Sequence, residues 1–477
     1  MRKKVFTLLV ILSTAALSVQ AQQTPEPLRL WGADITGSLR IRGESWDWFD
    51  TEAGNDDYTF AGALLRISAA RTAPRFDWQV EAAAPALLFL PDDAVAPPPQ
   101  GQLGFGGSYF AANRETDTAS LFLKQAFVRF KSQSTSTRLG RFEFIEGTEA
   151  MPKDPRLAAL RRDRIAHRLI GNFGFTHVGR SIDGAHFTCN CPAGNITAMA
   201  GFPTRGVFDV DGQKTLDDVY IGYGSFTRAF SPTGEWRFFV TTYGDDRNVI
   251  KTDNRSAAVR NLDRESIAVH SLGGHYLHRF DAALSPDFLF WGNWQTGDWG
   301  TQDHSAWAVA IEGGVAPSAR WNPSIRGGWF RGSGDPSPND EDHETFFPML
   351  PTPRIYARYP FFNSMNNEDL FLSLGLKPAS TVTLRADVHR LSLSEANDLW
   401  YVGGGAFEDS SFGYAGRPSN GQTSLGTLVD VSVDVALSSV TSLGLYFARA
   451  LGSDVVDRIY PDGADGSFVY VELSRRF

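Results

Sequence analysis

Charged side chains recur at every second position along several short apolar segments, and these are the residues of the chain that could do chemistry. Alternate residues of a β-strand share one face, so each segment would carry charges on one side and aliphatic groups on the other. The charged residues with this placement are Arg40, Arg42, Glu44, Arg66, Arg129, Arg326, Arg385, Asp387, Asp430 and Asp434. A guanidinium is always charged and pairs with a carboxylate through two parallel hydrogen bonds, so the arginines predict a surface that binds anions.

The interleaved carboxylates have two interpretations. In a water-filled pore they would hold the arginines in place and keep an anion from binding too tightly to leave, as conduction requires. The same residues would also suit salt-bridge ladders that fill a closed barrel. The sequence leaves both interpretations open.

The elements that position these charges are strands, and residues 427–450 show the alternation of apolar and polar residues most clearly. Val429, Val431 and Val433 alternate with Asp430 and Asp434. A short connection at residues 438–440 is followed by a second alternating run. No helix places residues in this way, so the segment predicts a β-hairpin with one apolar and one polar face.

The lengths of the connections indicate the architecture. Alternation and turn residues predict about 18 strands over the chain. Short connections, such as those at residues 132–135, 231–234 and 437–440, alternate with long ones, such as residues 145–179 and 331–368. This alternation is typical of barrels in the bacterial outer membrane. We predict an all-β fold: a single transmembrane up-and-down antiparallel β-barrel with short periplasmic turns and long extracellular loops.

Both ends of the chain fit that location. Arg2, Lys3 and Lys4 precede an apolar run, which predicts a signal peptide over residues 1–21 and a barrel domain over residues 22–477. The last strand ends in Phe477, which resembles the recognition signal of outer-membrane barrel assembly. We therefore expect outer-membrane lipid and the barrel-assembly machinery as partners.

Composition and motifs exclude other classes of function. The chain carries 45 Lys plus Arg against 54 Asp plus Glu, a balance opposite to that of a nucleic-acid binder. It has no G-x-S-x-G, H-E-x-x-H or P-loop motif, and its nine histidines lack ligand spacing. We expect no enzyme activity, no cofactor and no metal site. A Ca²⁺ site in the acidic segment 335–342 is the alternative to a solvated loop.

Two local features remain. Residues 154–169 have apolar positions spaced for one face of a helix, and we expect a short amphipathic helix in an outer loop. Cys189 and Cys191 lie one residue apart, and the sequence does not decide whether they form a disulfide.

Several segments resemble a known family. Residues 139–143, Leu-Gly-Arg-Phe-Glu, are similar to a Gly-Arg-Gln strand end, with Phe142 where Gln is usual. Residues 179–184, Gly-Arg-Ser-Ile-Asp-Gly, are similar to an Arg-Ser-Phe-Asp-Gly element, and residues 333–351 to a long acidic loop. These elements resemble the alginate-export family of bacterial outer-membrane β-barrels. By position, the resemblance adds Arg141, Arg180 and Asp183 to the lining of a constriction.

The resemblance implies a function. It implies an anion-selective channel that passes an anionic polysaccharide such as alginate, a polyuronate, outward across the outer membrane, with periplasmic export partners. Two alternatives remain open: a porin for other small anionic or sugar-like solutes, and a plugged structural or adhesive barrel whose loops bind a partner.

Overall fold

The computed structural model of the protein describes residues 27–352 and 356–477. The predicted signal peptide lies outside the described residues. No helix in the described ranges is long and apolar enough to cross a membrane.

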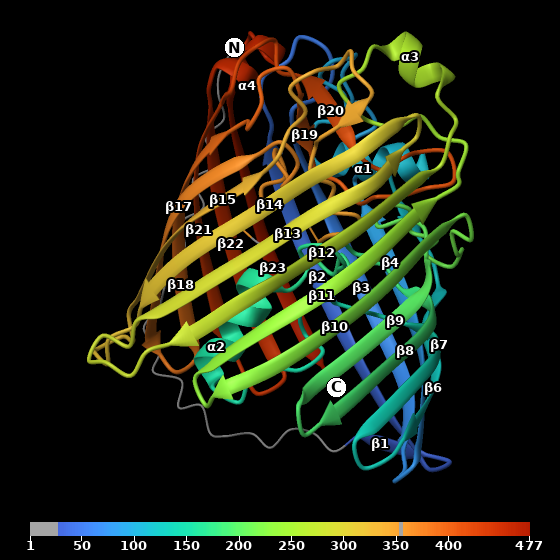
Figure 1. Cartoon of the computed structure of the whole chain (residues 1–477), viewed down its shortest axis with the longest axis vertical. Helices are drawn as coiled ribbons and strands as arrows, with labels where there is room; N and C mark the ends of the chain where they lie inside the picture. Colours follow the sequence, from blue (N-terminus) through green and yellow to red (C-terminus); the bar gives the residue numbers. More distant parts are fainter. Residues whose placement is uncertain (1–26, 353–355) are drawn as a thin grey trace.

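Eighteen antiparallel strands close into one barrel (Figure 1). Each strand pairs with its neighbours along the chain, and the first and last strands pair with each other from Ser38 opposite Arg476 to Asp47 opposite Ser467. The barrel strands are β2 (Ala33–Asp47), β3 (Asp57–Thr72), β4 (Phe76–Leu88), β6 (Phe122–Lys131), β7 (Thr135–Phe142), β8 (Ile182–Cys191), β9 (Gly194–Pro203), β10 (Val219–Ser231), β11 (Gly234–Asp245), β12 (Ile267–Arg279), β13 (Asp287–Trp299), β14 (Gln302–Val315), β15 (Ser324–Gly332), β17 (Glu368–Ala379), β18 (Val382–Ser392), β21 (Ser424–Ala436), β22 (Thr441–Gly452) and β23 (Asp465–Arg476). The predicted fold class and strand number are confirmed.

Shorter elements lie outside this ring or in its connections. They are β1 (Leu28–Leu30), β5 (Thr118–Ala119), β16 (Asp342–His343), β19 (Leu399–Val402), β20 (Ala415–Pro418), α1 (Phe105–Asn113), α2 (Pro155–Leu160), the π-helical turn η1 (Arg161–Ile165), α3 (Ala257–Leu262) and α4 (Asp454–Ile459). In Figure 1, α1, α3, α4, β19 and β20 gather at one end of the barrel, whereas α2 lies toward the other.

The aliphatic rows of the strands face outward. On β21, Val429 and Val431 are 39% and 40% exposed, whereas the alternating Leu428 and Asp430 are buried. Exposed Leu, Val, Ile, Phe and Trp residues continue this pattern on the other strands. Large apolar side chains in a continuous exposed belt fit a hydrocarbon surrounding, because water would make such a belt unfavourable.

Short and long connections separate to opposite ends of the barrel, as predicted, with one exception. The C-terminal residue of β23 and the first residues of β2 lie on the side of the barrel that has the short turns. The exception is the link between β13 and β14, where Trp299 pairs with Gln302 across a tight turn at the long-loop end. Gly300 occupies the left-handed region there, with φ +65°, which a side chain would disfavour.

The long connections do not all extend away from the barrel, because several fold into it. Residues 155–165 form α2 and η1, within the helix predicted over residues 154–169, but they lie inside the barrel near the short-turn end. Arg156 donates hydrogen bonds to the carbonyl oxygen of Ser285 at 2.6 Å and to the carboxylate of Asp287, both beside the β12–β13 turn. The expectation of a helix in an outer loop is therefore corrected. Buried charges of the barrel wall hold this helix inside.

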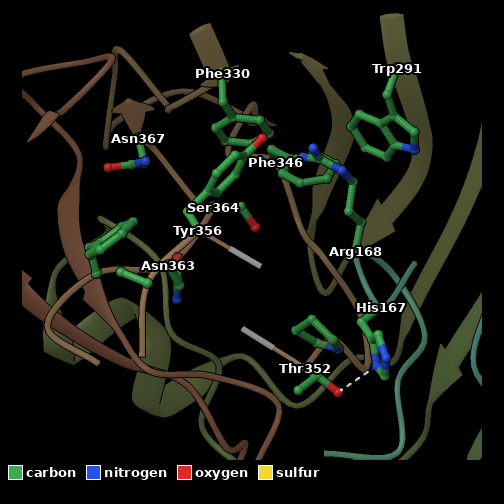
Figure 2. Close-up of a pocket in the computed structure, with 13 residues that line it drawn as sticks. His167, Arg168, Trp291, Phe330, Phe346, Thr352, Tyr356, Asn363, Ser364 and Asn367 are labelled. Carbon is green, nitrogen blue, oxygen red and sulfur yellow. Dashed lines mark hydrogen bonds between the residues drawn. The ribbon is translucent and has the colours of Figure 1, made fainter. Parts of the chain in front are cut away.

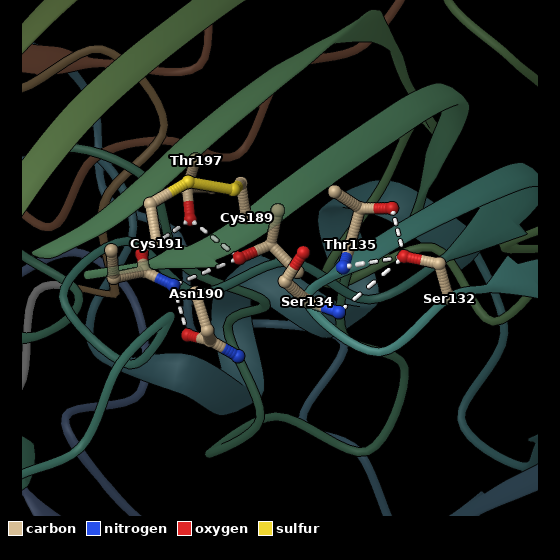
Figure 3. The surroundings of a disulfide bond; sticks show 9 residues. Ser132, Ser134, Thr135, Cys189, Asn190, Cys191 and Thr197 are labelled. Atoms are coloured by element: carbon tan, nitrogen blue, oxygen red, sulfur yellow. Dashed lines mark hydrogen bonds between the residues drawn. A yellow bond between two sulfur atoms is a disulfide. The ribbon is translucent and has the colours of Figure 1, made fainter. Parts of the chain in front are cut away.

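The two cysteines are bonded to each other at the end of β8. Their Cα atoms lie 5.6 Å apart, and the disulfide sits at the short β8–β9 turn (Figure 3). The neighbouring turn at Ser132 is closed by the hydroxyl of that residue, which accepts hydrogen bonds from the backbone N–H groups of Ser134 and Thr135.

Candidate functional site

The lumen is crossed by residues 143–181, which we call the inward loop. Its first carboxylate, Glu143, accepts a hydrogen bond from Arg66 of β3 at 2.7 Å. Glu146 pairs with Arg237 on β11 at 2.7 Å, and Glu149 pairs with the same guanidinium at 3.1 Å. The inward loop thus reaches from the β3 wall to the β11 wall.

In the second half of the inward loop the charges are reversed: the loop supplies arginines and the barrel wall supplies carboxylates. Arg161 bonds to Glu235 of β11 at 3.0 Å, and Arg164 bonds to Glu312 of β14 at 2.9 Å. Arg168 lies 3.5 Å from the second carboxylate oxygen of Glu312. All of these side chains are buried, so each charge depends on its partner. The inward loop is fixed to the wall by ion pairs rather than by apolar contact alone.

The predicted residues of β2 lie on the inner face and form one buried cluster. Arg42 pairs with Glu472 of β23 at 2.7 Å and with Glu44 at 3.2 Å. The ring of Phe175, from the inward loop, lies 4.1 Å from the Arg42 guanidinium. Arg40 instead donates to the carbonyl oxygens of Gly174, at 2.7 Å, and of Thr176.

Most of the other predicted strand residues also face inward and have partners of opposite charge. Arg66 pairs with Glu81 as well as Glu143, and Arg129 pairs with Asp77 near the short-turn end. Arg326 pairs with Asp287, and with Glu312 at 3.3 Å.

The last predicted strand residues lie on β18 and β21. Arg385 lies 2.5 Å from Asp387 on β18. Asp430, on β21, is directly opposite Asp387 in the strand register. Asp434 is on the same face of β21, nearer the short turns and exposed.

Two residues inferred from the resemblance are not on this face. Arg141 and Asp183 pair directly across β7 and β8, with 2.7 Å between guanidinium and carboxylate. Arg141 lies two residues from Leu139 on β7, and Asp183 lies directly opposite Phe202, so each shares a face with its neighbour. Leu139 and Phe202 are exposed on the outer surface. Residues 213–215 cover the pair, and Arg141 donates to the carbonyl oxygen of Gln213 at 2.8 Å. The expectation that Arg141 and Asp183 line the constriction is therefore corrected.

Arg180 lies within the packed interior but not on a strand. It donates to the carbonyl oxygens of Gly171 at 3.2 Å, Leu350 at 2.9 Å and Gly405. These three acceptors come from three different long connections. Arg180 therefore joins the inward loop to the connections β15–β17 and β18–β21.

The acidic segment 335–342 does not gather its carboxylates. Asp335 is buried and its backbone N–H donates to Asp398 at 3.0 Å, whereas Asp340 and Asp342 are exposed. Burial raises the pKa of Asp335 to about 7 and that of Asp398 to about 6. This arrangement favours a packed and partly solvated loop over the Ca²⁺ alternative.

An open part of the lumen lies at the short-turn end, between the inward loop and the strands β2, β3 and β21–β23. It is a cavity of about 530 Å³. The charged residues that line it are Arg40, Arg66, Glu143, Arg475 and Arg476. A smaller cavity of about 40 Å³ lies deeper, where Arg168 meets the rings of Trp291, Phe330 and Tyr356 (Figure 2). It has room for a few water molecules and none for a sugar ring.

Several residues of the site were not predicted from the sequence. Arg237 stands between Trp236 and Phe238, and Glu312 follows Ile311, so strand alternation alone could have placed both on the inner face. Arg161, Arg164 and Arg168 share one side of the predicted helix, but only the folded chain puts that helix inside the barrel.

Comparisons with known proteins agree with this architecture. A family model described as alginate export matches residues 216–448, which confirms the resemblance over that part of the chain. No curated protein matches the sequence.

Solved structures of outer-membrane proteins share the fold. The structure of opdK from Pseudomonas aeruginosa is similar with a TM-score of 0.55 and 9% identity, over 93% of this chain and 99% of that one. A BenF-like porin from Pseudomonas fluorescens Pf-5 is similar with a TM-score of 0.56 and 8% identity, over 94% and 99%. OccAB2 from Acinetobacter baumannii gives 0.55 and 10%, over 93% and 98%. The fold, the family match and the apolar belt make this an outer-membrane channel barrel and confirm the predicted location in the bacterial outer membrane.

Proposed function

Because this chain matches the alginate-export family over residues 216–448 within an outer-membrane barrel, we propose that it is a channel for anionic solutes. A carboxylated sugar chain, such as the polyuronate alginate, is the solute class that we favour. Passage is outward in this proposal, as the family description suggests, and it requires periplasmic partners that deliver the solute.

The charge of the open cavity is the observation that carries the proposal. Four arginines and one glutamate line it, although the whole chain has a formal charge of −9. Low-dielectric walls focus the field of such a group and raise the local concentration of anions. Arg475 and Arg476 lie at its entrance on β23, and Arg40 and Arg66 lie farther in.

The lining also suits a uronate residue in particular. A planar guanidinium binds a carboxylate through two hydrogen bonds. The hydroxyl groups of Ser438, Thr441 and Ser474, which line the same cavity, offer donors and acceptors to sugar hydroxyls. Ion pairing of Arg66 to Glu143 limits how tightly an anion binds, which favours release.

One observation favours a second function, that of a plugged structural barrel. The inward loop is tied to opposite walls, and the connections joined through Arg180 fill the long-loop end of the lumen. If these contacts are permanent, solutes do not pass and the outer loops are the functional surface.

Recordings of the purified barrel in a planar bilayer separate the two functions. Across a KCl gradient, we expect an anion-selective current whose reversal potential moves toward zero in Arg476→Gln. That residue lines the cavity, and its side chain donates a hydrogen bond to the carbonyl oxygen of Ser439 and, within the described ranges, forms no ion pair with the inward loop. The inward loop therefore keeps its anchors. Arg320→Gln removes the same charge from an exposed turn outside the cavity and should leave selectivity unchanged.

Solute identity needs a second measurement on the same channel. Oligouronate added on the short-turn side should block the current, with weaker block in Arg40→Gln and Arg66→Gln. Block by neutral oligosaccharides of equal length would redirect the proposal to other sugars. A barrel that carries no current, or a cation-selective one, would refute the anion channel.

A further inference from the structure

We propose that Asp387, His389 and Asp430 bind one divalent transition-metal ion, such as Zn²⁺, on the inner face of β18 and β21. The site is independent of which solute the channel carries. Sequence motifs gave no sign of it, because its ligands come from two strands separated by more than 40 residues of chain.

The strand register brings the three side chains together. Asp387 lies directly opposite Asp430, and His389 follows two residues along β18 on the same face. One ligand atom from each residue lies within 4.8 Å of the others, and among the described residues no other group of three possible ligands is this close. Small side-chain rotations bring such atoms to the spacing that a four-coordinate ion with bonds of about 2.0–2.2 Å needs.

Several polar atoms of this buried cluster lack hydrogen-bond partners in the described part of the chain. Asp387, His389 and Asp430 are 3%, 0% and 4% exposed. Within the described ranges, nothing hydrogen-bonds to Nε2 of His389, to Oδ1 of Asp387 or to Oδ2 of Asp430, whereas Oδ2 of Asp387 is ion-paired with Arg385 at 2.5 Å. Buried polar atoms are almost always satisfied, so three unpaired atoms in one cluster indicate a ligand there.

The histidine is also held as metal-binding histidines are. Its Nδ1 donates to the carboxylate of Asp369 on β17 at 3.0 Å, and the ring of Phe371 stacks on it at 5.8 Å. The Asp369 carboxylate fixes the ring orientation and leaves the lone pair of Nε2 directed at Asp430. An imidazole with two carboxylates is a ligand set that suits Zn²⁺ and its neighbours in the first transition row better than Ca²⁺ or Mg²⁺.

The competing explanation is a protonated histidine in an ion-pair network. The charges that face the cluster are the carboxylates of Asp369, Asp387 and Asp430 and the guanidiniums of Arg385 and Arg358. A protonated His389 would balance them. However, Nε2 lies 3.8 Å from Oδ2 of Asp430, beyond hydrogen-bond range. This distance is a little longer than the separation of about 3.4 Å between two ligands of one tetrahedral ion with bonds of about 2.1 Å, and a small side-chain rotation closes the difference.

The test measures Zn²⁺ binding to the intact barrel in detergent after treatment with a chelator. Calorimetric titration should give one Zn²⁺ per chain, with Ca²⁺ and Mg²⁺ as comparisons that bind more weakly. His389→Gln and Asp430→Asn should abolish the stoichiometric binding, and Asp369→Asn should weaken it by about 10- to 100-fold. Arg385→Gln should tighten it, because that guanidinium competes for Asp387.

Controls keep the result interpretable. His270→Gln removes an exposed histidine from β12 and should bind Zn²⁺ like the unchanged protein. Heat-dependent migration on a gel shows that each variant is a folded barrel. Binding that is absent in the unchanged protein, or equal in His389→Gln, would overturn the site and support the protonated histidine. Co²⁺ gives a second readout, since its absorption spectrum should change in the unchanged protein and not in His389→Gln.

Discussion

Glu312→Gln tests whether buried charges hold the inward loop in the lumen. Glu312 is 1% exposed and lies 2.9 Å from Arg164, 3.5 Å from Arg168 and 3.3 Å from Arg326. The glutamine is the same size and keeps a carbonyl oxygen, so packing changes little. The substitution removes the negative charge that compensates guanidiniums from both the inward loop and the wall.

The size of the effect follows from what remains around each arginine. Breaking a buried ion pair costs about 3–5 kcal/mol, because the remaining charge is left uncompensated. Arg326 keeps Asp287, and Arg164 keeps the rings of Tyr356 and Phe371 at 4.6 and 4.4 Å, so the lower value applies. About 3 kcal/mol corresponds to an opening equilibrium about 100-fold more favourable.

Hydrogen exchange of residues 155–169 measures that equilibrium directly, because exchange requires local opening. We expect exchange about 100-fold faster in Glu312→Gln, together with a larger single-channel conductance. Asp303→Asn, an exposed carboxylate on the same strand, is the matched control and should exchange like the unchanged protein. Unchanged exchange and conductance in Glu312→Gln would refute the anchoring role of these ion pairs.

Three further predictions concern other parts of the molecule. Burial raises the pKa of Asp335 from 3.8 to about 7, so its contribution to loop packing is complete below about pH 4 and is lost as pH rises through 7. Limited proteolysis of the β15–β17 connection should therefore accelerate from pH 5 to pH 8, and Asp335→Asn should remove most of that dependence. Arg141→Gln should leave the reversal potential unchanged while exposing residues 204–218 to protease, and a change in selectivity would contradict its outward placement. Gly62→Val should speed hydrogen exchange in residues 172–180, because a Cβ at that position would lie 2.3 Å from Nε2 of His177. Gly43→Val, whose Cβ would meet open space outside the barrel, should leave that exchange unchanged. Equal exchange in the two variants would contradict the contact.

The barrel itself was predictable because its information is local. A strand in a membrane barrel must be apolar on alternate residues, and each hairpin needs a short turn, so strand positions and inner faces follow from neighbours in sequence. Alternation predicts in this way that Arg40, Arg42 and Arg66 face inward. The resemblance instead assigns Arg141 to the lumen, whereas alternation puts Arg141 on the same outer face as Leu139.

The course of the long connections was not predictable, because alternation says nothing about a loop. The periodicity of residues 154–169 predicts a helix wherever that helix lies, since burying Leu157 and Ile165 requires only an apolar neighbour. Its position inside the barrel depends on pairs such as Arg164 with Glu312, which are separated by more than 140 residues.

The sequence by itself determined a closed transmembrane barrel with charges on its inner wall. The tertiary structure decided which of those charges remain accessible, because partners from distant segments neutralise most of them. It also decided that Asp387, His389 and Asp430 meet, since only the register between β18 and β21 sets that distance. Periodicity fixes the face of a side chain, but the partners that it meets across a lumen depend on the closure of the whole ring.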